Sequence, residues 1–481
     1  MFEQIFKNID KILRTDDNCS TELDYVEQSS WLLFLKWLDD YDKEKKIKSE
    51  LENKKYTPIL EKEFQWSSWA VVKKDNGEID FNKNISGQDL KFFVEDKLFP
   101  YLSSFKDDPK NIDTIEYKIG EIFSGIRNKL ADGHTIRDVI DQVEKLKFQS
   151  NDEKHELSDL YEEKIKKMGN AGRNGGEYYT PRSLISSIVK AVNPKIGEIV
   201  YDGAVGSAGF LVEAYNHIKN SKSLNSSELI KLEKKTLYGV EKKGLGYILG
   251  IMNMILHGIE SPNIVRMNTL EINVQEIQNK DRVEVILANP PFGGGEKTQV
   301  QDNFNIRSSE TAYLFLQHFI KKLKNGGRCG VIIKNTFLTN DDALKLRQQL
   351  LTECNLHTIL DLPRGVFQAG VQTVVLFFTK GSATKEILYH KPNIERNLGK
   401  TNPLNFKDLS NFDDIFITRK NDKNTWSKKI NQIDKKTWDL GVKNPNQIKE
   451  IIKKEPNEIF NEIENLQNKS NQIFRDIKKL I

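Results

Sequence analysis

Cysteine is scarce in this sequence, and long hydrophobic runs are missing. The 481 residues include three cysteines, Cys19, Cys329 and Cys354, which form neither a Cys-x-x-Cys pair nor a Cys/His cluster with zinc spacing. This pattern excludes a disulfide-rich secreted domain, so we expect free thiols and no metal site. The first residues lack the apolar core of a signal peptide, and no run is long enough to span a bilayer. We expect a cytoplasmic protein without membrane contact.

A strong charge of either sign is also missing. The net charge is +4, with 38% hydrophobic and 30% charged residues, which is ordinary for a soluble globular protein. The slight basic excess is compatible with nucleic-acid binding but falls short of the composition of an autonomous DNA-binding domain. The length is enough for two or three domains.

Residues 1–150 show helical periodicity and little else. Ile5, Ile9 and Ile12 recur at helical spacing, and the segment 31–38 is apolar on nearly every side, as in a buried helix. No cluster of Ser, His, Cys or paired carboxylates suggests catalysis there. We expect an N-terminal helical domain over residues 1–150, with a role in packing or partner contact.

Strands and helices alternate in the middle of the chain, which predicts an α/β fold with a doubly wound sheet of about seven strands. The expected strands are Ile199–Tyr201, Thr236–Val240, Asn263–Met267, Val283–Ala288, Gly330–Ile333, Leu356–Asp361 and Thr373–Phe378. The loops after the first, second and fourth of them then lie along one edge of the sheet. We assign this domain to residues 151–390.

The fourth expected strand ends at Asn289-Pro290-Pro291-Phe292. Neither proline can donate a ladder hydrogen bond, so Asn289 lies at a carboxyl end, where open α/β sheets bind ligands. The Asn289 side-chain oxygen and the Pro290 carbonyl could accept hydrogens from an exocyclic amino group, while Phe292 stacks on a planar base. A plain strand followed by a proline turn fits the same four residues.

A loop rich in glycine and asparagine, residues 169–180, precedes the first strand. The helix after it begins with Thr180 as N-cap and Pro181 in the first turn. The segment fits either an interdomain linker or a ligand-binding loop.

The loop after the first strand, residues 202–209, also contains glycines that allow close backbone approach. Their spacing matches neither the dinucleotide pattern G-x-G-x-x-G nor a P-loop. Glu241, at the tip of the second strand, is placed to accept both hydroxyls of a ribose. These features favour a nucleoside without a pyrophosphate over NAD or ATP.

Taken in order, these motifs resemble those of the amino-group DNA methyltransferases. The matching residues are Asp202-x-Ala204-x-Gly206-x-x-Gly209-Phe210 and Asn289-Pro290-Pro291-Phe292. Three further segments are similar specifically to the modification (M) subunit of type I restriction-modification systems: Glu177-Tyr178-Tyr179-Thr180-Pro181-Arg182, Asn253-x-x-x-x-His257-Gly258-Ile259 and Leu362-Pro363-x-Gly365-Val366-Phe367. The resemblance covers roughly residues 1–460 and is weakest in the helical first third.

The resemblance implies a Rossmann-like fold that uses S-adenosylmethionine. By this resemblance, Asp202 of the present sequence would orient the methionyl ammonium of the cofactor. Glu241 would hold its ribose, and Asn268 would face its adenine amino group. The backbone contacts would come from Gly206, Ser207, Ala208 and Gly209. The segment that closes over the methionine end would be Glu177, Tyr178, Tyr179, Thr180, Pro181 and Arg182.

Two positions depart from the family pattern. Gly203 stands where a proline is usual, and Asn268 stands where an acidic residue is usual. An amide oxygen at position 268 can still accept a hydrogen bond, but without charge assistance. We therefore expect weakened cofactor binding.

The function implied by the resemblance is methylation of adenine at N6 in duplex DNA, which protects host DNA in a restriction-modification (phage-defence) system. The target must be flipped out, because its amino group is buried in the duplex. Two carbonyl acceptors would then aim the nitrogen lone pair at the methyl donor. The alternatives are methylation of cytosine at N4, methylation of a protein glutamine or RNA, and a structural subunit with an impaired site.

The end of the chain divides into two segments. Residues 391–456 are rich in lysine and lack the bulk of a sequence-reading domain, so we expect a solvated surface or phosphate contacts. Residues 457–481 carry a heptad stripe, with Ser470 at one seam position, formed by Ile459, Ile463, Leu466, Ile473, Ile477 and Leu480.

This stripe fits a helix packed on its own domain or, as the resemblance implies, a helix docked on a separate specificity subunit. The same resemblance adds double-stranded DNA, a second copy of the chain and a restriction subunit as partners.

Overall fold

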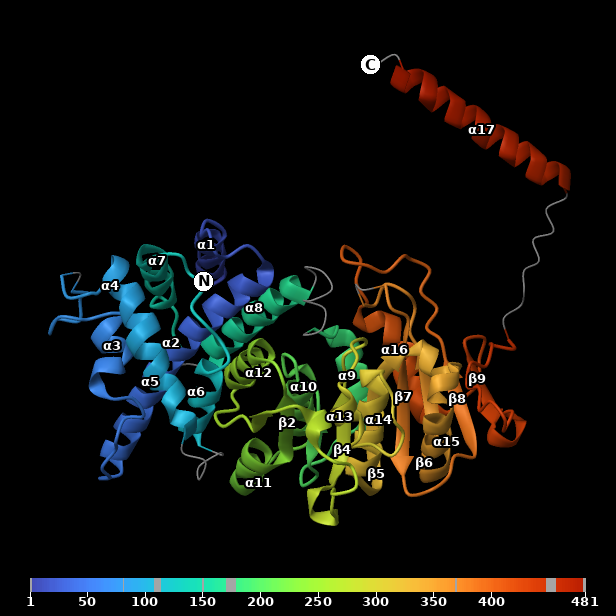
Figure 1. Ribbon diagram of the computed structural model, residues 1–481, viewed down its shortest axis with the longest axis horizontal. Coiled ribbons are helices and arrows are strands. Elements are labelled where there is room, and N and C mark those ends of the chain that lie inside the picture. Colours follow the sequence, from blue (N-terminus) through green and yellow to red (C-terminus); the bar gives the residue numbers. More distant parts are fainter. Residues whose placement is uncertain are drawn as a thin grey trace.

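The computed structural model describes residues 2–80, 82–107, 114–148, 151–169, 179–367, 370–446 and 456–478. In these ranges the chain forms an N-terminal group of helices, an α/β part built on a nine-stranded sheet, and a C-terminal helix that stands apart from both (Figure 1). The expected α/β class with helical parts at both ends is confirmed.

The N-terminal helices pack around α2 (Glu22–Leu51), which is buried on every side from Tyr25 to Leu38. Long apolar side chains at nearly every position of this stretch leave no polar face to solvate, so the helix becomes the centre of the bundle. The other helices of this part are α1 (Glu3–Arg14), α3 (Trp66–Trp69), α4 (Gly87–Phe92), α5 (Phe99–Ser104), α6 (Ile115–Phe123), α7 (Gly133–Val143) and α8 (Asn151–Gly169).

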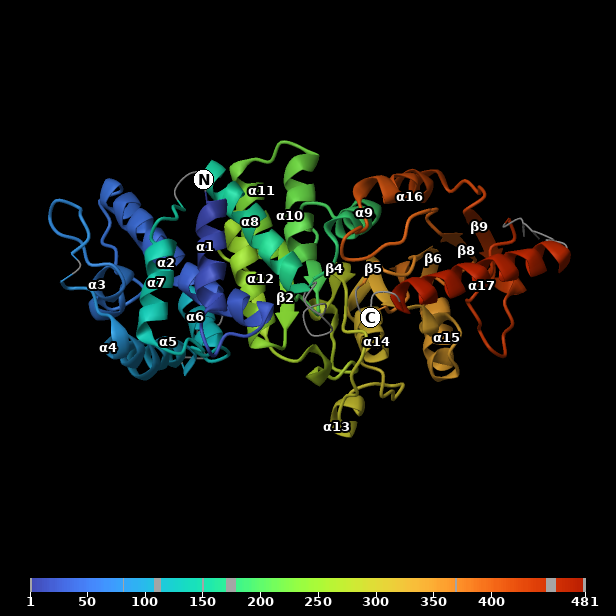
Figure 2. The same ribbon diagram turned by 90° about the horizontal axis from the view of Figure 1, so that it is seen from above.

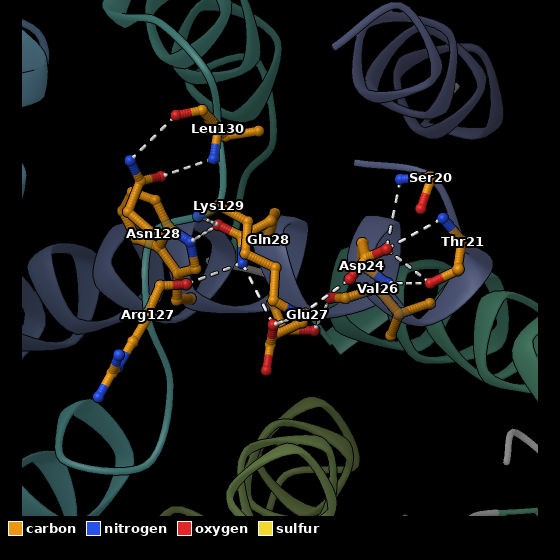
Figure 3. Close-up of polar contacts among 12 residues, drawn as sticks. Ser20, Thr21, Asp24, Val26, Glu27, Gln28, Arg127, Asn128, Lys129 and Leu130 are labelled. Atoms are coloured by element: carbon orange, nitrogen blue, oxygen red, sulfur yellow. Dashed lines mark hydrogen bonds and ion pairs between the residues drawn. The ribbon is translucent and has the colours of Figure 1, made fainter. Parts of the chain in front are cut away.

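The first turns of α2 bind the segment that connects α6 to α7 (Figure 3). Lys129 Nζ lies 2.8 Å from an Asp24 carboxylate oxygen and 2.6 Å from a Glu27 carboxylate oxygen. The Gln28 side chain donates to the Arg127 carbonyl at 3.0 Å. These bonds satisfy polar groups on a buried helix and hold the connecting segment against it.

The sheet has the strand order β3-β2-β1-β4-β5-β7-β6-β8-β9. Neighbouring strands are parallel except for β7, which runs antiparallel to β5 and β6, and β9, which runs antiparallel to β8. The strands are β1 (Val200–Asp202), β2 (Leu237–Glu241), β3 (Ile264–Arg266), β4 (Val283–Ala288), β5 (Leu323–Lys334), β6 (Cys354–Asp361), β7 (Thr373–Lys380), β8 (Glu386–His390) and β9 (Thr425–Lys429). The order reverses between β1 and β4, at the position where open α/β sheets bind ligands.

The predicted count of about seven strands was too low. The two additional strands, β8 and β9, extend the sheet beyond β6, and β9 lies in the segment interpreted as a lysine-rich surface. β9 reads Thr-Trp-Ser-Lys-Lys. This sequence has no apolar run, so nothing in it marked a strand. Polar and lysine side chains are nevertheless common in edge strands, because they prevent the sheet from pairing with a further strand.

Helices cover both faces of the sheet, and β4 is buried between them. Val285 and Leu287 pack in the core with α9, α10 and α12, whereas Ile286 and Ala288 pack in the core with α14 and α15. The first of these cores continues into the N-terminal helices. The helices of this part are α9 (Arg182–Val192), α10 (Gly209–Ser221), α11 (Ser226–Lys231), α12 (Gly244–Leu256), α13 (Thr298–Gln301), α14 (Thr311–Lys322), α15 (Leu344–Glu353) and α16 (Phe406–Thr418).

Helix α17 (Pro456–Lys478) projects away from the rest of the molecule (Figure 1). Every side chain from Asn457 to Lys478 is exposed, and five of these belong to the heptad stripe: Ile459, Ile463, Leu466, Ile473 and Ile477. Leu480, the last residue of the predicted stripe, lies outside the described residues. The described part of the chain therefore offers no cover for this apolar face.

Candidate functional site

Asn289 lies at the carboxyl end of β4, as the proline motif predicts. Its side-chain Nδ2 donates to Thr180 Oγ1 at 2.9 Å, which fixes the orientation of the amide. Its Oδ1 is buried and has no partner among the described residues. Leaving a buried oxygen without a hydrogen bond reduces the free energy of unfolding by about 1–3 kcal/mol. This acceptor is therefore available to a donor that the chain does not itself supply.

Two clefts meet at Asn289. The first is open to solvent, has a volume of about 440 Å³ including its mouth, and is bounded by the end of β1, the loop after it and the starts of α9 and α10. Its lining includes these predicted site residues: Tyr179, Thr180, Arg182, Asp202, Gly206, Ser207, Gly209 and Asn289. Pro181 lines the second cleft, Ala208 is buried behind the loop, and Glu177 and Tyr178 lie outside the described residues.

The loop after β1 brings backbone to the surface of the first cleft. Gly206 has φ +53°, and a Cβ at Gly209 would lie 2.7 Å from Ile185 Cδ1, so both positions suit glycine. Ala208 adopts the left-handed region with φ +60°, a conformation that strains a residue with a side chain. The resulting tight turn exposes backbone groups where a ligand can approach.

Gly203, which replaces the usual proline, is compatible with its surroundings. A Cβ at this position would lie 2.9 Å from Phe319 Cε1 and 3.0 Å from the Tyr201 hydroxyl. The Gly203 carbonyl accepts a hydrogen bond from Thr269 Oγ1 at 2.6 Å. The space that a larger residue would fill is thus taken by other side chains of this protein, and the loop remains anchored.

Asp202 places a fully buried carboxyl group in the first cleft. Its Oδ1 accepts a hydrogen bond from the Ala204 amide at 3.0 Å. Burial, with a smaller contribution from the nearby Glu241 carboxylate, raises the pKa of this carboxyl to about 8. A cationic ligand group would reverse this shift, which fits the ammonium of an amino-acid moiety.

Glu241 and Asn268 lie at the ends of β2 and β3 but do not line the first cleft. Glu241 accepts hydrogen bonds from the amides of Gly206 at 2.9 Å and Lys243 at 2.8 Å, and burial raises its pKa. The Asn268 side-chain oxygen accepts from the Leu270 amide at 3.2 Å. Their roles toward a ribose and an adenine stay predictions, because in this structure their oxygens bind backbone.

Sequence reasoning missed Glu162, a residue of α8 that lines the first cleft. Its carboxylate binds Arg182 Nε at 2.9 Å and also Arg182 Nη2, while Arg182 Nη1 donates to the Gly209 carbonyl at 3.0 Å. His257 Nε2 lies 3.3 Å from the same carboxylate. Glu162 has no motif of its own in a helix rich in acidic residues, so no sequence signal marked it.

A second contact anchors the same loop from α12. Asn253 Nδ2 donates to the Ser207 carbonyl at 2.8 Å, and the Asn253 carbonyl lies 2.8 Å from His257 Nδ1. The carbonyls of Ser207 and Gly209 are therefore held by side chains from α12 and α9. This explains physically why Asn253 and His257 stand in one motif.

The second cleft is also open to solvent, has a volume of about 2020 Å³ including its mouth, and shares Asn289 with the first. Pro290, Pro291 and Phe292 form part of its wall, together with the loop that contains Phe367. The rings of Phe292 and Phe367 meet edge to face, with 5.0 Å between centroids and 78° between planes. The cleft thus offers an aromatic surface directly beside the free Asn289 acceptor, as recognition of a nucleobase requires.

The described residues show neither a metal site nor a membrane span. Within the described ranges, no group of three or more His, Cys, Asp or Glu side chains is arranged to hold a metal ion. None of the described helices is long and apolar enough to cross a membrane.

Known proteins and family models match nearly the whole length of this chain. The family model for N-6 DNA Methylase matches residues 152–454, and the model for the HsdM N-terminal domain matches residues 2–162. The methylase subunit of the type I restriction enzyme EcoEI of Escherichia coli is 34% identical over 493 aligned residues, which cover 99% of this chain and 97% of that protein.

Solved structures of type I restriction-modification proteins are also similar to this chain. A modification subunit assigned to a type I restriction enzyme of Vibrio vulnificus YJ016 superposes with a TM-score of 0.78 at 32% identity, covering 92% of this chain and 96% of that one. A chain from a study of complex assembly and conformational transition in a type I R-M system gives a TM-score of 0.80 at 32% identity, covering 99% and 97%.

Proposed function

Since this chain belongs to the N-6 DNA methylase family and is a type I methylase subunit that uses S-adenosylmethionine to methylate adenine at N6, we propose that Asn289–Phe292 perform this transfer on an adenine flipped out of duplex DNA. The observation that carries the proposal is the buried, unpaired Asn289 Oδ1 at the junction of the two clefts. A free acceptor at that point suits the amino group of a base in the second cleft.

The residues of the first cleft fit the cofactor. Asp202 provides a carboxyl group for its ammonium, and the loop from Gly206 to Gly209 presents backbone close enough for contact. Tyr179, Thr180 and Arg182 form the opposite wall. When bound, S-adenosylmethionine supplies a methyl group on a positively charged sulfur.

The chain's own residues then prepare the adenine. The exocyclic nitrogen is a poor nucleophile because its lone pair is delocalised into the ring. Asn289 Oδ1 and the Pro290 carbonyl each accept one of its hydrogens and draw the amino group toward tetrahedral geometry. Thr180 holds the Asn289 amide in the orientation that leaves Oδ1 free, and Phe292 stacks on the base.

The partners in this proposal follow from the relatives, which are named as subunits of type I restriction enzymes. Residues 1–150 form the helical domain, 151–390 the catalytic domain, 391–456 the lysine-rich segment and 457–481 the docking helix. α17 packs on a separate specificity subunit, and a second copy of the chain and a restriction subunit join the complex. The DNA substrate places its site of action in the cytoplasm.

Two alternatives are less well supported. Methylation of cytosine at N4 or of a protein or RNA does not agree with the matched family. The structural-subunit alternative relied on Gly203 and Asn268, but Phe319 and Tyr201 leave room only for a glycine at position 203. The catalytic function is therefore retained.

Replacement of the proposed acceptor tests the catalytic motif. We expect Asn289→Ala to lower methyl transfer at least about 100-fold, because a preorganised polar contact to the reacting group is lost. Cofactor affinity should stay within a few-fold, since no cofactor contact is proposed for this side chain. The measurements are labelled-methyl incorporation by the complex with its specificity subunit and calorimetry with S-adenosylmethionine. Asn305→Ala, at an exposed asparagine outside both clefts, is the matched control; near-full turnover of Asn289→Ala would disprove the assignment.

A further inference from the structure

An exposed aromatic ring stands at the rim of the second cleft. Phe406 is the first residue of α16 and lines the same cleft as Phe292, yet 60% of its surface is exposed. A single exposed aromatic residue is unremarkable on a protein surface. Phe406 differs from such residues because it lies in the same cleft as the proposed base-binding wall and is carried on a turn that polar contacts support. These two features suggest a role in DNA binding.

The turn that presents Phe406 is braced by polar contacts. Arg396 donates to both carboxylate oxygens of Asp408, at 2.6 and 2.5 Å, and to Asn402 Oδ1 at 3.0 Å. Asn405 caps the start of α16 and accepts from the Lys407 and Asp408 amides. The ring is thus carried on a rigid support, so little conformational entropy is lost when it meets a ligand.

The same turn is fastened to both walls of the site. The Leu404 carbonyl accepts from Ser183 Oγ at 3.0 Å, next to Arg182 of the first cleft. Gly365 has φ +88°, and a Cβ there would lie 2.2 Å from the Leu398 carbonyl oxygen, so the rim packs directly on the loop that carries Phe367. α9 and α16 lie side by side (Figures 1 and 2). Phe406 therefore has a fixed position relative to the catalytic motif.

The charged side chains that line the second cleft have one sign, although Arg182 is paired with Glu162 and Lys334 with Glu310 behind the lining. Its charged lining residues are Lys166, Arg182, Lys334 and Lys400, and no carboxylate is among the described residues that line it. Lys400 is exposed on the rim close in sequence to Phe406. A cationic rim with an aromatic ring suits the phosphate backbone and the stacked bases of DNA.

We propose that Phe406 is a wedge that stacks on the base pair next to the target adenine and stabilises the flipped-out state, while Lys400 contacts the adjacent phosphate. This inference rests on the proposed function, because it assumes that the second cleft receives the adenine. Flipping breaks two stacking contacts of the adenine, and an aromatic surface in the vacated position replaces part of what is lost. Phe406 acts on the neighbouring base pair and is distinct from Phe292, which stacks on the adenine.

The test compares two DNA duplexes with the assembled complex of this chain and its specificity subunit. In one duplex the target adenine is paired with thymine, and in the other it faces an abasic site, which removes the pairing that flipping must break. We expect Phe406→Ala to lower methylation of the paired duplex about tenfold or more and to leave the unpaired duplex within about twofold of the wild type. Phe406→Trp should restore activity on the paired duplex.

The control is Ile417→Ala, because Ile417 is 81% exposed on the same helix but does not line the cleft. It should leave both activities unchanged. Equal activity of Phe406→Ala and wild type on the paired duplex, or an equal loss on both duplexes, would overturn the wedge. So would failure of Phe406→Ala to assemble with the specificity subunit in size-exclusion chromatography, since the ring would then belong to a protein interface. A wild-type complex inactive on both duplexes would overturn the proposed function and the wedge with it.

Discussion

Asp202 is a site residue whose protonation the fold controls through burial. Burial is the main cause of its raised pKa of about 8, and Glu241 adds to it, while the Ala204 amide opposes the shift. At pH 7 the carboxyl is therefore mainly protonated before a cation arrives. Binding of an ammonium group then releases this proton, which couples cofactor affinity to pH.

The same shift predicts a pH-dependent stability. The folded pKa lies above the unfolded value of 3.8, so the contribution of Asp202 is fully present below about pH 4 and is lost as pH rises through about 8. Asp202→Asn has no proton to lose. Without cofactor, we expect the thermal midpoint of the wild type to fall relative to that of Asp202→Asn between pH 5 and 9. Asp75→Asn, at an exposed position, is the control; a constant difference across this pH range would show that Asp202 is not protonated in the fold.

At the residue scale, the sequence was informative where backbone chemistry dictates the position. A double proline must end β4, so Asn289 could be placed, and glycines at 206 and 209 marked a tight loop. Glu241 and Asn268 were placed correctly on their strand ends, but their side-chain partners could not be predicted. Those partners are backbone amides brought near by tertiary packing.

At the scale of elements, α8 is coupled to the first cleft, the proposed cofactor site, through Glu162. One carboxylate holds Arg182 of α9 and lies near His257 after α12, and Arg182 in turn holds the loop at Gly209. A change in the position of α8 must therefore reach the first cleft. Such a contact between elements that are distant in sequence has no local signature, which is why Glu162 was missed.

This coupling predicts the effect of a conservative substitution. Glu162→Gln keeps the size of the side chain but removes the charge that pairs with Arg182, a charge-assisted contact of roughly 1.5–3 kcal/mol. We expect KM for S-adenosylmethionine to rise about tenfold with kcat nearly unchanged. The neighbouring Glu163 is exposed and gives the control Glu163→Gln. An unchanged KM, or the same rise in the control, would contradict a positioning role for Glu162.

Apolar runs in the sequence predict some strands and helices but miss others. The seven expected strands were recognised because their cores are β-branched and aliphatic, whereas β9 pairs with β8 through a polar sequence. For α17, the heptad stripe was read from the sequence, but Phe460 and Phe474, which are 72% and 69% exposed, were not included. They adjoin the stripe and widen it beyond a narrow seam, as in a helix that packs into a bundle.

At the scale of the whole molecule, the proposed catalytic residues lie together, but the described residues include no separate domain for reading DNA sequence. After β7 the described strands and α-helices are β8, α16, β9 and α17, and the first three belong to the sheet or pack on it. Sequence readout takes several side chains placed in the major groove, each good bidentate contact contributing about 1–3 kcal/mol. We therefore expect the sequence specificity to come from another chain.

The exposed apolar face of α17 is the proposed binding site for that chain. Ile463, Leu466 and Ile473 are 53%, 63% and 59% exposed, a state that a helix retains only until a partner buries the stripe. We expect the isolated protein to bind S-adenosylmethionine but to show little or no site-specific methylation. Deletion of residues 457–481 should prevent assembly with the specificity subunit and spare cofactor binding, because no residue of α17 lines the first cleft.

The decisive measurement is methylation of a defined target by the chain alone, by the chain with the specificity subunit, and by the truncated chain with the same subunit, with calorimetry for the cofactor in each case. We expect site-specific methylation only by the full chain with the specificity subunit, because catalysis and sequence readout would then lie on different chains joined through α17. Leu466→Glu gives a milder disruption than truncation, because a carboxylate in an apolar seam must be desolvated or the seam must open. Asn468→Glu, on the polar side of the helix, is its control. Robust site-specific methylation by the chain alone, or undiminished assembly after truncation, would show that readout or docking resides elsewhere in the molecule.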